Sequence, residues 1–542
     1  MKRKILPCIL LALVAALNLA SQPAAAQEQP MLVVSLSGVD EILGDVQFIM
    51  ELAGNAPLGQ IAAMTATPYT QGIDTARPVG IVVTANGPEI QALGMIPVKD
   101  LNKFLKSIEP QIGPADDVGG GIRVVNGPSK VYIKESNGWA FVSNSESNLG
   151  SLPANPLTAL NGMDKQYDIG VRAIVKNVPP ALKAQAIAQI RQGVEAKMNE
   201  SGDADEIETQ KQVLEAQIKQ WESMLNETDE IVVGWQIDRE KQSTHIDISQ
   251  SAVAGSPTAE SLSKLSSVTT RFAGFAVEDA AIRTNMTNEL GAADIERTIS
   301  MLGPTRDSVM KEIDEDDDLP DAKSKATAKS VVNKLFDVVE ATVRGGKLDG
   351  AASLTLDNNT LSLISGMQVA DGKKVEEALD ELLELAKDEP KFPAVRKNAS
   401  KAGNVNIHTM TIPVPADEED ARDVFGEELD VAVGIGPDSV YLGFGENCLS
   451  KIQSAIQGST GANATSPFAL NLAMSRILAF ASHFDDNPAV AAIAESLKAN
   501  QGSDNVVVSS KAIPNGVSYR LEIQEGVVKS VGAVTGAQPA GA

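Results

Sequence analysis

The chain has 542 residues, of which 71 are acidic and 46 are basic, so its formal net charge is −25. A surface this acidic repels phosphate backbones and anionic lipid head groups, which argues against nucleic acid and against electrostatic membrane binding. Cations and basic proteins are the partners that such a charge favours.

The first 26 residues have the pattern of a secretory signal peptide. Three basic residues precede an apolar run from Ile5 to Leu19, and Ala24–Ala26 are small residues after which a signal peptidase cuts. Cys8 lies inside the apolar run and does not follow small residues, so we expect no lipid anchor. The sequence therefore predicts export to the periplasm or the cell surface.

Cleavage leaves a chain with no other apolar run long enough to cross a bilayer, so no transmembrane segment is expected after processing. This chain is too long for one hydrophobic core, which predicts two to four domains. Cys448 is its only cysteine. No internal disulfide can form, and packing must hold the fold together.

The first predicted elements are a strand at 31–36 and a helix at 39–52. A hairpin follows at 79–96, with Asn86-Gly87 as a strong two-residue turn signal. The next helix begins at Val98, and its apolar residues recur at helical spacing. They are Leu101, Phe104, Leu105 and Ile108.

A different block, 131–149, comes next and places two short strands around Asn137-Gly138. After it, the order strand, helices, hairpin, helix returns. The predicted ranges are 168–175 for the strand, 180–198 and 206–225 for the helices, 231–254 for the hairpin, and a helix from Pro257. Apolar positions continue through 180–225, so these helices are expected to be the longest in the first half.

The third set of elements has the clearest pattern. A strand at 281–286 and helical sequence through Ile313 and over 322–343 precede a hairpin at 348–369. The second strand of this hairpin places apolar residues on one face at period two, and the helix after it has an apolar stripe. These residues are Leu361, Leu363, Met367 and Val369 in the strand, and Val375, Leu379, Leu382, Leu383 and Ala386 in the helix.

The block then occurs again, because 431–449 aligns without gaps on 131–149 and has Pro437-Asp438 at its turn. The fourth set of elements follows it. Its predicted ranges are 468–474 for the strand, 476–484 and 488–499 for the helices, 506–523 for a hairpin turning at Pro514–Gly516, and a short tail helix.

The order of one set of elements, one block and a second set therefore occurs twice along the chain, which predicts an internal duplication. The expected fold class is α+β, with antiparallel sheets built from repeated strand, helix, hairpin and helix units and with helices packed on the sheets. The expected parts are a signal peptide at 1–26, a first half at 27–265, a second half at 266–535 and a flexible tail at 536–542.

Carboxylates at Asp314, Asp316 and Asp318 alternate as calcium ligands do. However, Leu319 stands where a calcium loop needs glycine, and Lys325 stands where it needs a bidentate glutamate. We therefore predict solvated loops at 312–318, at 417–420 and at the linker 458–465, and no metal site.

The remaining residues that could carry chemistry form no recognised set. Gly443 and Gly445 lack the other residues of a nucleotide loop, so a structural turn is expected. His245 and His408 fall in predicted strands and His483 in a predicted helix, without zinc-ligand spacing. Trp139, Trp221 and Trp235 are expected to be core anchors, and not a sugar-stacking platform.

Cys448 begins a predicted helix and is the residue most easily mistaken for a nucleophile. The alignment of the two blocks places Asn148 at the same point, and no histidine is spaced to act as its base. We therefore expect a structural cysteine. No catalytic, cofactor-binding or metal-ligating residue is assigned.

The signal peptide, the duplicated plan and the segment Gly72–Gly80 together resemble a group of large uncharacterised exported proteins of planctomycete-type bacteria. The resemblance covers nearly all of the mature chain and implies no activity, cofactor or site residue.

The sequence thus favours a non-enzymatic exported protein that binds a partner or serves as a scaffold, the partner being an envelope protein or a molecule bearing cations. Two other functions stay open. One is a carrier of a small apolar ligand held between sheet and helices. The other is a hydrolase that uses a pair of carboxylates, which cannot be picked out in so acidic a chain.

Overall fold

The computed structural model describes residues 29–86, 89–127, 129–200, 218–219, 221–316, 319, 321–357, 359–386, 393, 395–484 and 487–536. The predicted signal peptide lies outside these residues, as does the tail from 537. The chain divides between Ser256 and Pro257 into two compact units, named unit 1 and unit 2. Each unit combines helices with an antiparallel sheet, so the α+β class is confirmed.

The sheet of unit 1 is antiparallel throughout its described residues. Its strands lie side by side in the order β4-β5-β6-β7-β3-β2-β1-β8-β9-β10. Their bounds are β1 (Pro30–Leu36), β2 (Val79–Asn86), β3 (Glu89–Pro97), β4 (Ala115–Gly119), β5 (Ile122–Asn126), β6 (Lys130–Ser136), β7 (Trp139–Ser143), β8 (Ile169–Ala173), β9 (Thr228–Asp238) and β10 (Ser243–Ala252).

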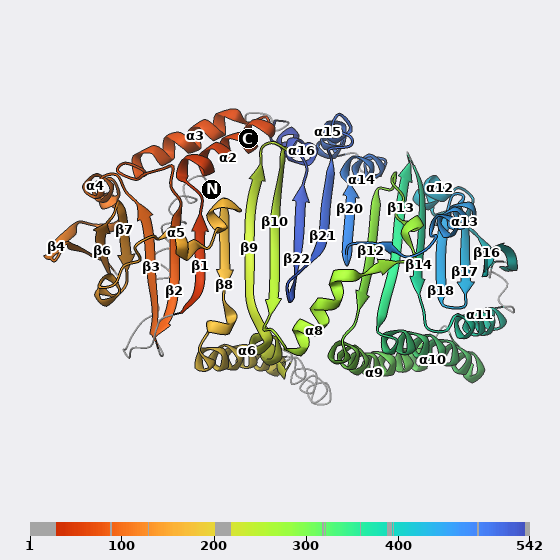
Figure 1. The fold of residues 1–542 in the computed structure, drawn as a ribbon. Coiled ribbons are helices and arrows are strands. Elements are labelled where there is room, and N and C mark those ends of the chain that lie inside the picture. Colours follow the sequence, from red (N-terminus) through yellow and green to blue (C-terminus); the bar gives the residue numbers. More distant parts are fainter. Residues whose placement is uncertain are drawn as a thin grey trace. The chain divides into compact units, whose positions relative to one another are not determined.

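Unit 1 has five labelled helices in its described part, besides a helical segment at 221–227. They are α2 (Val39–Leu52), α3 (Ala56–Ala66), α4 (Leu101–Ile112), α5 (Leu157–Leu160) and α6 (Pro180–Glu200). Figure 1 shows the α2–α3 pair across one end of the strands and α6 across the other. With 21 residues, α6 is the longest described helix of this unit, as its apolar pattern predicts.

The main sheet of unit 2 has the order β15-β16-β17-β18-β14-β13-β12-β20-β21-β22, also antiparallel. The bounds are β12 (Ile282–Glu289), β13 (Lys347–Asp357), β14 (Thr360–Gln368), β15 (Val395–Ala402), β16 (Val405–Pro413), β17 (Glu428–Gly436), β18 (Ser439–Gly445), β20 (Phe468–Ala473), β21 (Asn505–Ile513) and β22 (Gly516–Ile523). A separate pair joins β11 (Thr269–Thr270) to β19 (Asn463–Ala464). Counted along the chain, the main strands of unit 2 pair in the same order as those of unit 1.

The described helices of unit 2 lie between and around its strands. They are α8 (Pro257–Ser263), α9 (Ala292–Glu315), α10 (Ala322–Arg344), α11 (Gly372–Ala386), α12 (Glu419–Phe425), α13 (Cys448–Gly458), α14 (Met474–Ala481), α15 (Pro488–Lys498) and α16 (Glu525–Gly536). Figure 1 shows α9 and α10 at one end of the unit 2 strands and α14 and α15 at the other.

The predicted hairpins are confirmed. Pairs β2–β3, β9–β10, β13–β14 and β21–β22 are antiparallel neighbours. In β14 the buried face is the opposite of the predicted one, because Ile364 lies in the core whereas Met367 is exposed. The fourth turn is one residue tighter than predicted, because Ile513 pairs directly with Gly516. Both blocks fold as predicted, with Ser136 opposite Trp139 in one and Gly436 opposite Ser439 in the other.

Several elements were not predicted. Helix α3 has no charged residue and alternates poorly between polar and apolar positions, so its sequence lacks an amphipathic signal. Strands β4 and β15 are mostly exposed and carry polar residues, which removes the period-two pattern. Each also contains a bulge, between Asp117 and Gly119 in β4 and between Arg396 and Ser400 in β15.

Each unit packs a core against its own sheet. In unit 1, Val33, Met95, Trp139 and Phe141 pack with residues of the 149–163 segment on one face, while α4 covers the other face of β3 and β7. In unit 2, an aromatic cluster of Phe272, Phe275 and Tyr441 packs beside α13, and the rings of Phe275 and Tyr441 are stacked. Gly366 lies beneath these rings, where an added Cβ would come within 2.8 Å of Phe272.

Candidate binding surface

One face of the unit 2 sheet carries no charged residue over the seven strands β14, β13, β12, β20, β21, β22 and β18. Charged residues of these strands, such as Arg283, Lys511 and Glu522, alternate to the opposite face. The apolar residues of the uncharged face are Ile282, Met286, Leu354, Leu363, Met367, Val440, Leu442, Phe444, Phe468, Leu470, Val506, Val508, Tyr519 and Leu521.

This face is open to solvent at its middle. On this face Met286 lies opposite Phe468, and Gly350 on β13 lies between Met286 and Met367. Tyr519 lies on the same face, opposite Ser510 of β21. The exposed fractions are 44% for Tyr519, 52% for Met286 and 55% for Met367. Leu442 on β18 is also exposed. Four large apolar side chains on one uncharged surface form a patch of the kind that marks a binding site.

Unit 1 also has an apolar row. Ile81, Val34, Val171, Val233 and Ile248 lie opposite one another across five neighbouring strands. Arg172, His245 and Asp247 alternate to the other face. Two of the five, on β9 and β10, are exposed.

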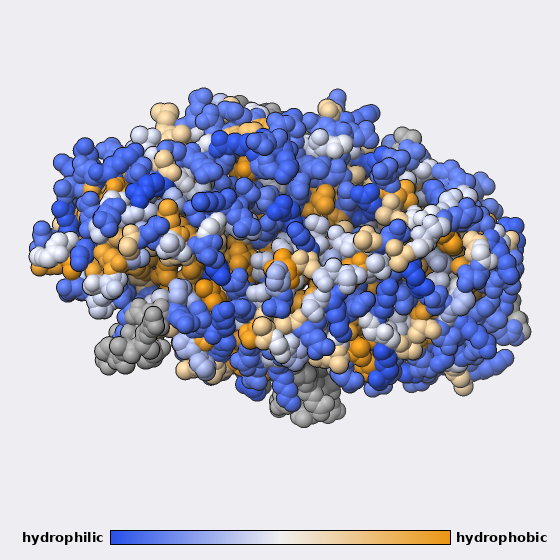
Figure 2. All heavy atoms as spheres, in the orientation of Figure 1, coloured by the Kyte–Doolittle hydropathy of each residue, from blue (hydrophilic) through white to orange (hydrophobic). Residues whose placement is uncertain are grey.

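The open faces lie where the helices leave the strands uncovered. Helices α10 and α14 both contact β13, and Figure 1 shows them at opposite ends of the unit 2 strands. Figure 2, from the same side, has orange hydrophobic patches among the blue residues where Figure 1 draws the strands. Helix α3 adds an exposed stripe of Leu58, Ile61 and Met64.

Cys448 is not placed for chemistry. It is 2% exposed, belongs to the unit 2 core beside Ile452, and its Sγ lies 3.6 Å from the carbonyl oxygen of Asp430. Burial, with the charge of Asp430, raises the pKa of its thiol. A buried thiol with a raised pKa is a poor nucleophile.

The three histidines lie apart from one another. His245 and His408 lie in β10 and β16, as predicted, but His483 lies in the turn after α14 and not in a helix, because α14 ends at Ala481. His408 is buried, with Nδ1 accepting from the backbone N–H of Asn398 and Nε2 4.0 Å from Glu376. Burial lowers its pKa.

The prediction of a solvated loop at 312–318 is partly wrong. Residues 312–315 form the last turn of α9, and Asp314 makes an ion pair with Lys329 of α10 at 2.5 Å. Asp316 follows the helix, and Asp318 lies outside the described residues. Two other predicted loops also contain structure, since 419–420 begin α12 and 463–464 form β19.

The glycines and tryptophans have structural positions. Gly445 has φ +86°, and an added Cβ would meet the carbonyl oxygen of Leu361 at 2.0 Å, so this strand pair needs glycine there. Gly443 lies in the same strand, against α13. Trp139 is buried, and the guanidinium carbon of Arg77 lies 4.2 Å from the centre of the indole ring. Trp221 and Trp235 are half-buried.

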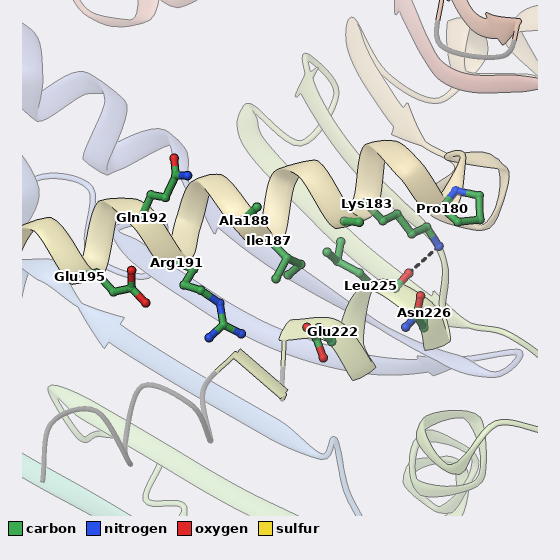
Figure 3. Close-up of a pocket in the computed structure, with 11 residues that line it drawn as sticks. Pro180, Lys183, Ile187, Ala188, Arg191, Gln192, Glu195, Glu222, Leu225 and Asn226 are labelled. Carbon is green, nitrogen blue, oxygen red and sulfur yellow. Dashed lines mark hydrogen bonds between the residues drawn. The ribbon is translucent and has the colours of Figure 1, made fainter. Parts of the chain in front are cut away.

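Figure 3 shows a cleft of about 580 Å³ between α6 and a helical segment at 221–227. The side chains of Lys183, Arg191, Glu195 and Glu222 line it together with apolar residues. Lys183 donates a hydrogen bond to the carbonyl oxygen of Leu225, at 2.7 Å, and burial lowers its pKa. A lining with charges of both signs favours no ligand class.

Sequence reasoning missed one carboxyl pair. Asp45 on α2 and Asp168, just before β8, lie close enough for their carboxyl groups to interact directly, and burial together with Asp45 raises the pKa of Asp168 to about 6. The two are 4% and 5% exposed. Substrate cannot reach carboxyls this deeply buried, so they do not support a hydrolase.

Across the described residues, no group of three or more His, Cys, Asp or Glu side chains is arranged to hold a metal ion. None of the described helices combines the length and hydrophobicity needed to span a bilayer. Comparison with protein-family models, with curated proteins and with solved structures gave no match. The arrangement of residues is suited to binding by apolar contact.

Proposed function

We propose that this chain is an exported, non-enzymatic protein that binds a partner on the uncharged face of the unit 2 sheet and so acts as a binding or scaffold module. The observation that carries the proposal is the exposure of Tyr519, Met286 and Met367 on the unit 2 face. Covering apolar surface is favourable by roughly 25 cal/mol per Å². A partner that covers these side chains therefore gains affinity without any charged contact.

The surroundings of the face indicate the chemistry of the partner. The face is broad and open, which suits the surface of an envelope protein better than a small ligand that needs enclosure. The chain as a whole carries a net charge of −25, so a partner with an apolar face and basic flanks is favoured by long-range attraction.

Export is proposed from the signal peptide pattern of residues 1–26 and from the resemblance to exported proteins of planctomycete-type bacteria. An internal duplication is proposed as the origin of the two units. Their shared strand order, with helices following β1 and β12 and again β8 and β20, supports it. So do the two-residue turns of both blocks.

The test is a comparison of matched methionine variants of the full chain. A fluorescent apolar probe, such as an anilinonaphthalene sulfonate, is expected to bind the wild type. The double substitution Met286→Glu and Met367→Glu should weaken probe binding about tenfold, because charge would enter an uncharged surface. Met301→Glu is the control, since Met301 is 57% exposed but lies on α9.

Envelope proteins captured by the wild type and by Met301→Glu should be lost from the double variant. If the double variant binds probe and captured protein as the wild type does, the sheet face is not the binding surface. Circular dichroism of all three proteins ensures that the comparison is between folded chains.

A further inference from the structure

The buried carboxyl pair of unit 1 has an incomplete set of partners. Asp168 Oδ2 accepts the backbone N–H of Ile237 at 2.7 Å, and Asp45 Oδ1 accepts from Nε of Arg239 at 2.6 Å. Asp45 Oδ2 is buried and has no hydrogen-bond partner within the described part of the chain. Because both carboxylates are acceptors, neither can satisfy the other when ionised.

Two buried hydroxyls at the end of β1 are also without partners in the described structure. Ser35 and Ser37 are 0% and 2% exposed, and neither Oγ has a hydrogen-bond partner in the described structure. The backbone N–H of Ser37 donates to the carbonyl oxygen of Asp168 at 2.9 Å, which places Ser37 beside that residue. Buried polar atoms without partners are rare in folded proteins and call for an explanation.

Unit 2 contains a buried hydroxyl and carboxylate whose hydrogen bonds are satisfied. Thr287 has the corresponding backbone bond, from its N–H to the carbonyl oxygen of Pro467 at 2.8 Å. Its hydroxyl donates to Asp349 Oδ1 at 3.0 Å, and Asp349 Oδ2 accepts the N–H of Arg271 at 2.8 Å. That single carboxylate needs nothing further, whereas the unit 1 site has two carboxylates.

The charges of the unit 1 site do not balance. Arg239 offsets one carboxylate, but the neighbouring Glu41 adds to the negative field at Asp168. Burying an uncompensated charge costs several kcal/mol. A positive charge held between the two carboxylates would remove this cost and would occupy the unused lone pairs.

We propose that Asp45, Asp168 and Ser37 bind a small hard cation, Ca²⁺ or Na⁺. Carboxylate and hydroxyl oxygens are the ligands that such ions prefer, and the buried position excludes larger hydrated ions. The ion would join α2 to the ends of β1 and β8, and so would fix the α2–α3 pair on the sheet.

Thermal unfolding of the full chain at pH 7.5, after treatment with a chelator, tests the proposal. CaCl₂ is added in one arm, and NaCl is compared with choline chloride at equal ionic strength in the other. The wild-type midpoint should rise by about 3 °C when the ion reaches tenfold its dissociation constant. A rise with either salt supports the site and identifies its ion.

The variants separate this site from other acidic positions. Asp168→Asn keeps an acceptor for Ile237 and should abolish the rise, whereas Ser37→Ala should require at least tenfold more ion. Asp349→Asn removes an equally buried carboxylate that already has its partners, and should keep the rise. An equal rise in Asp168→Asn, or no rise of the wild type with either ion, would overturn the proposal.

Discussion

Cys448 shows how burial decides the reactivity of a residue. Its position at the start of α13 would lower a thiol pKa at an accessible helix end, but desolvation in the core acts in the opposite direction and is the larger effect. The position therefore favours the neutral thiol at neutral pH.

We predict that the native thiol reacts slowly with a disulfide reagent at pH 7.5, at less than about a hundredth of the rate in the unfolded chain, because both thiolate formation and access are suppressed. Ellman's reagent with and without denaturant measures this. Rapid stoichiometric labelling of the folded protein would show that the thiol is accessible and would reopen a catalytic role.

His408 supplies a test of pH dependence. Burial keeps its pKa in the folded protein below the ordinary value of 6.5, although Glu376 and Asp380 oppose this effect and Lys397 adds to it. The unfolded chain therefore binds more protons than the folded one as the pH falls below 6.5. The contribution of His408 to stability is present above 6.5 and is lost on acidification.

Urea unfolding at pH 7.5 and pH 5.5 is expected to give a smaller loss of stability in His408→Gln than in the wild type. His483→Gln is the matched control, since His483 is exposed in a turn. A wild-type loss that persists unchanged in His408→Gln would assign the pH dependence to other groups.

At the scale of elements, two glycines are expected to respond to alanine in opposite directions. Gly366 in β14 has no room for a methyl group beneath Phe272 and Tyr441, so Gly366→Ala should cost about 1–3 kcal/mol of unfolding free energy. Gly193 in α6 has no atom within 4 Å of an added Cβ. Gly193→Ala should therefore stabilise by about 1 kcal/mol through helix propensity.

Chemical denaturation of the two variants measures both values. A neutral Gly366→Ala would mean that the aromatic cluster can move aside. A destabilising Gly193→Ala would mean that another surface packs on this part of α6.

The elements that could be predicted are those whose side chains alternate between a core and solvent. The hairpin β13–β14 alternates in this way, and its position was predicted within a residue or two, but its core face carries Ser362, Ile364 and Gly366. Leu361, Leu363 and Met367 lie on the opposite, open face. The helix α3 and the strand β4 could not be found in this way. In α3 nearly every side chain is small or apolar, and in β4 most side chains face solvent.

For the whole molecule, the alternation of apolar residues in the sequence predicts which residues share a face of a sheet, but not whether helices cover that face. Met367 was predicted to face a common core with the following helix, yet it is exposed, because α11 packs on β17 instead of covering the middle of β14. The carboxyl pair of Asp45 and Asp168 joins residues 123 positions apart. Only the folded chain brings such residues together, so no local spacing could have indicated them.

The bulges in β4 and β15 affect how copies of the protein meet one another. Each strand is the outermost of its sheet in the described structure and pairs with one neighbour only. Asp116 and Asp117 in β4, and Arg396 and Lys397 in β15, add charge where the ladder is already interrupted. A strand from another copy would find neither a regular hydrogen-bonding edge nor a neutral one, which suppresses fibre growth. Concentrated solutions should therefore resist aggregation by strand addition, even though the sheet faces are apolar.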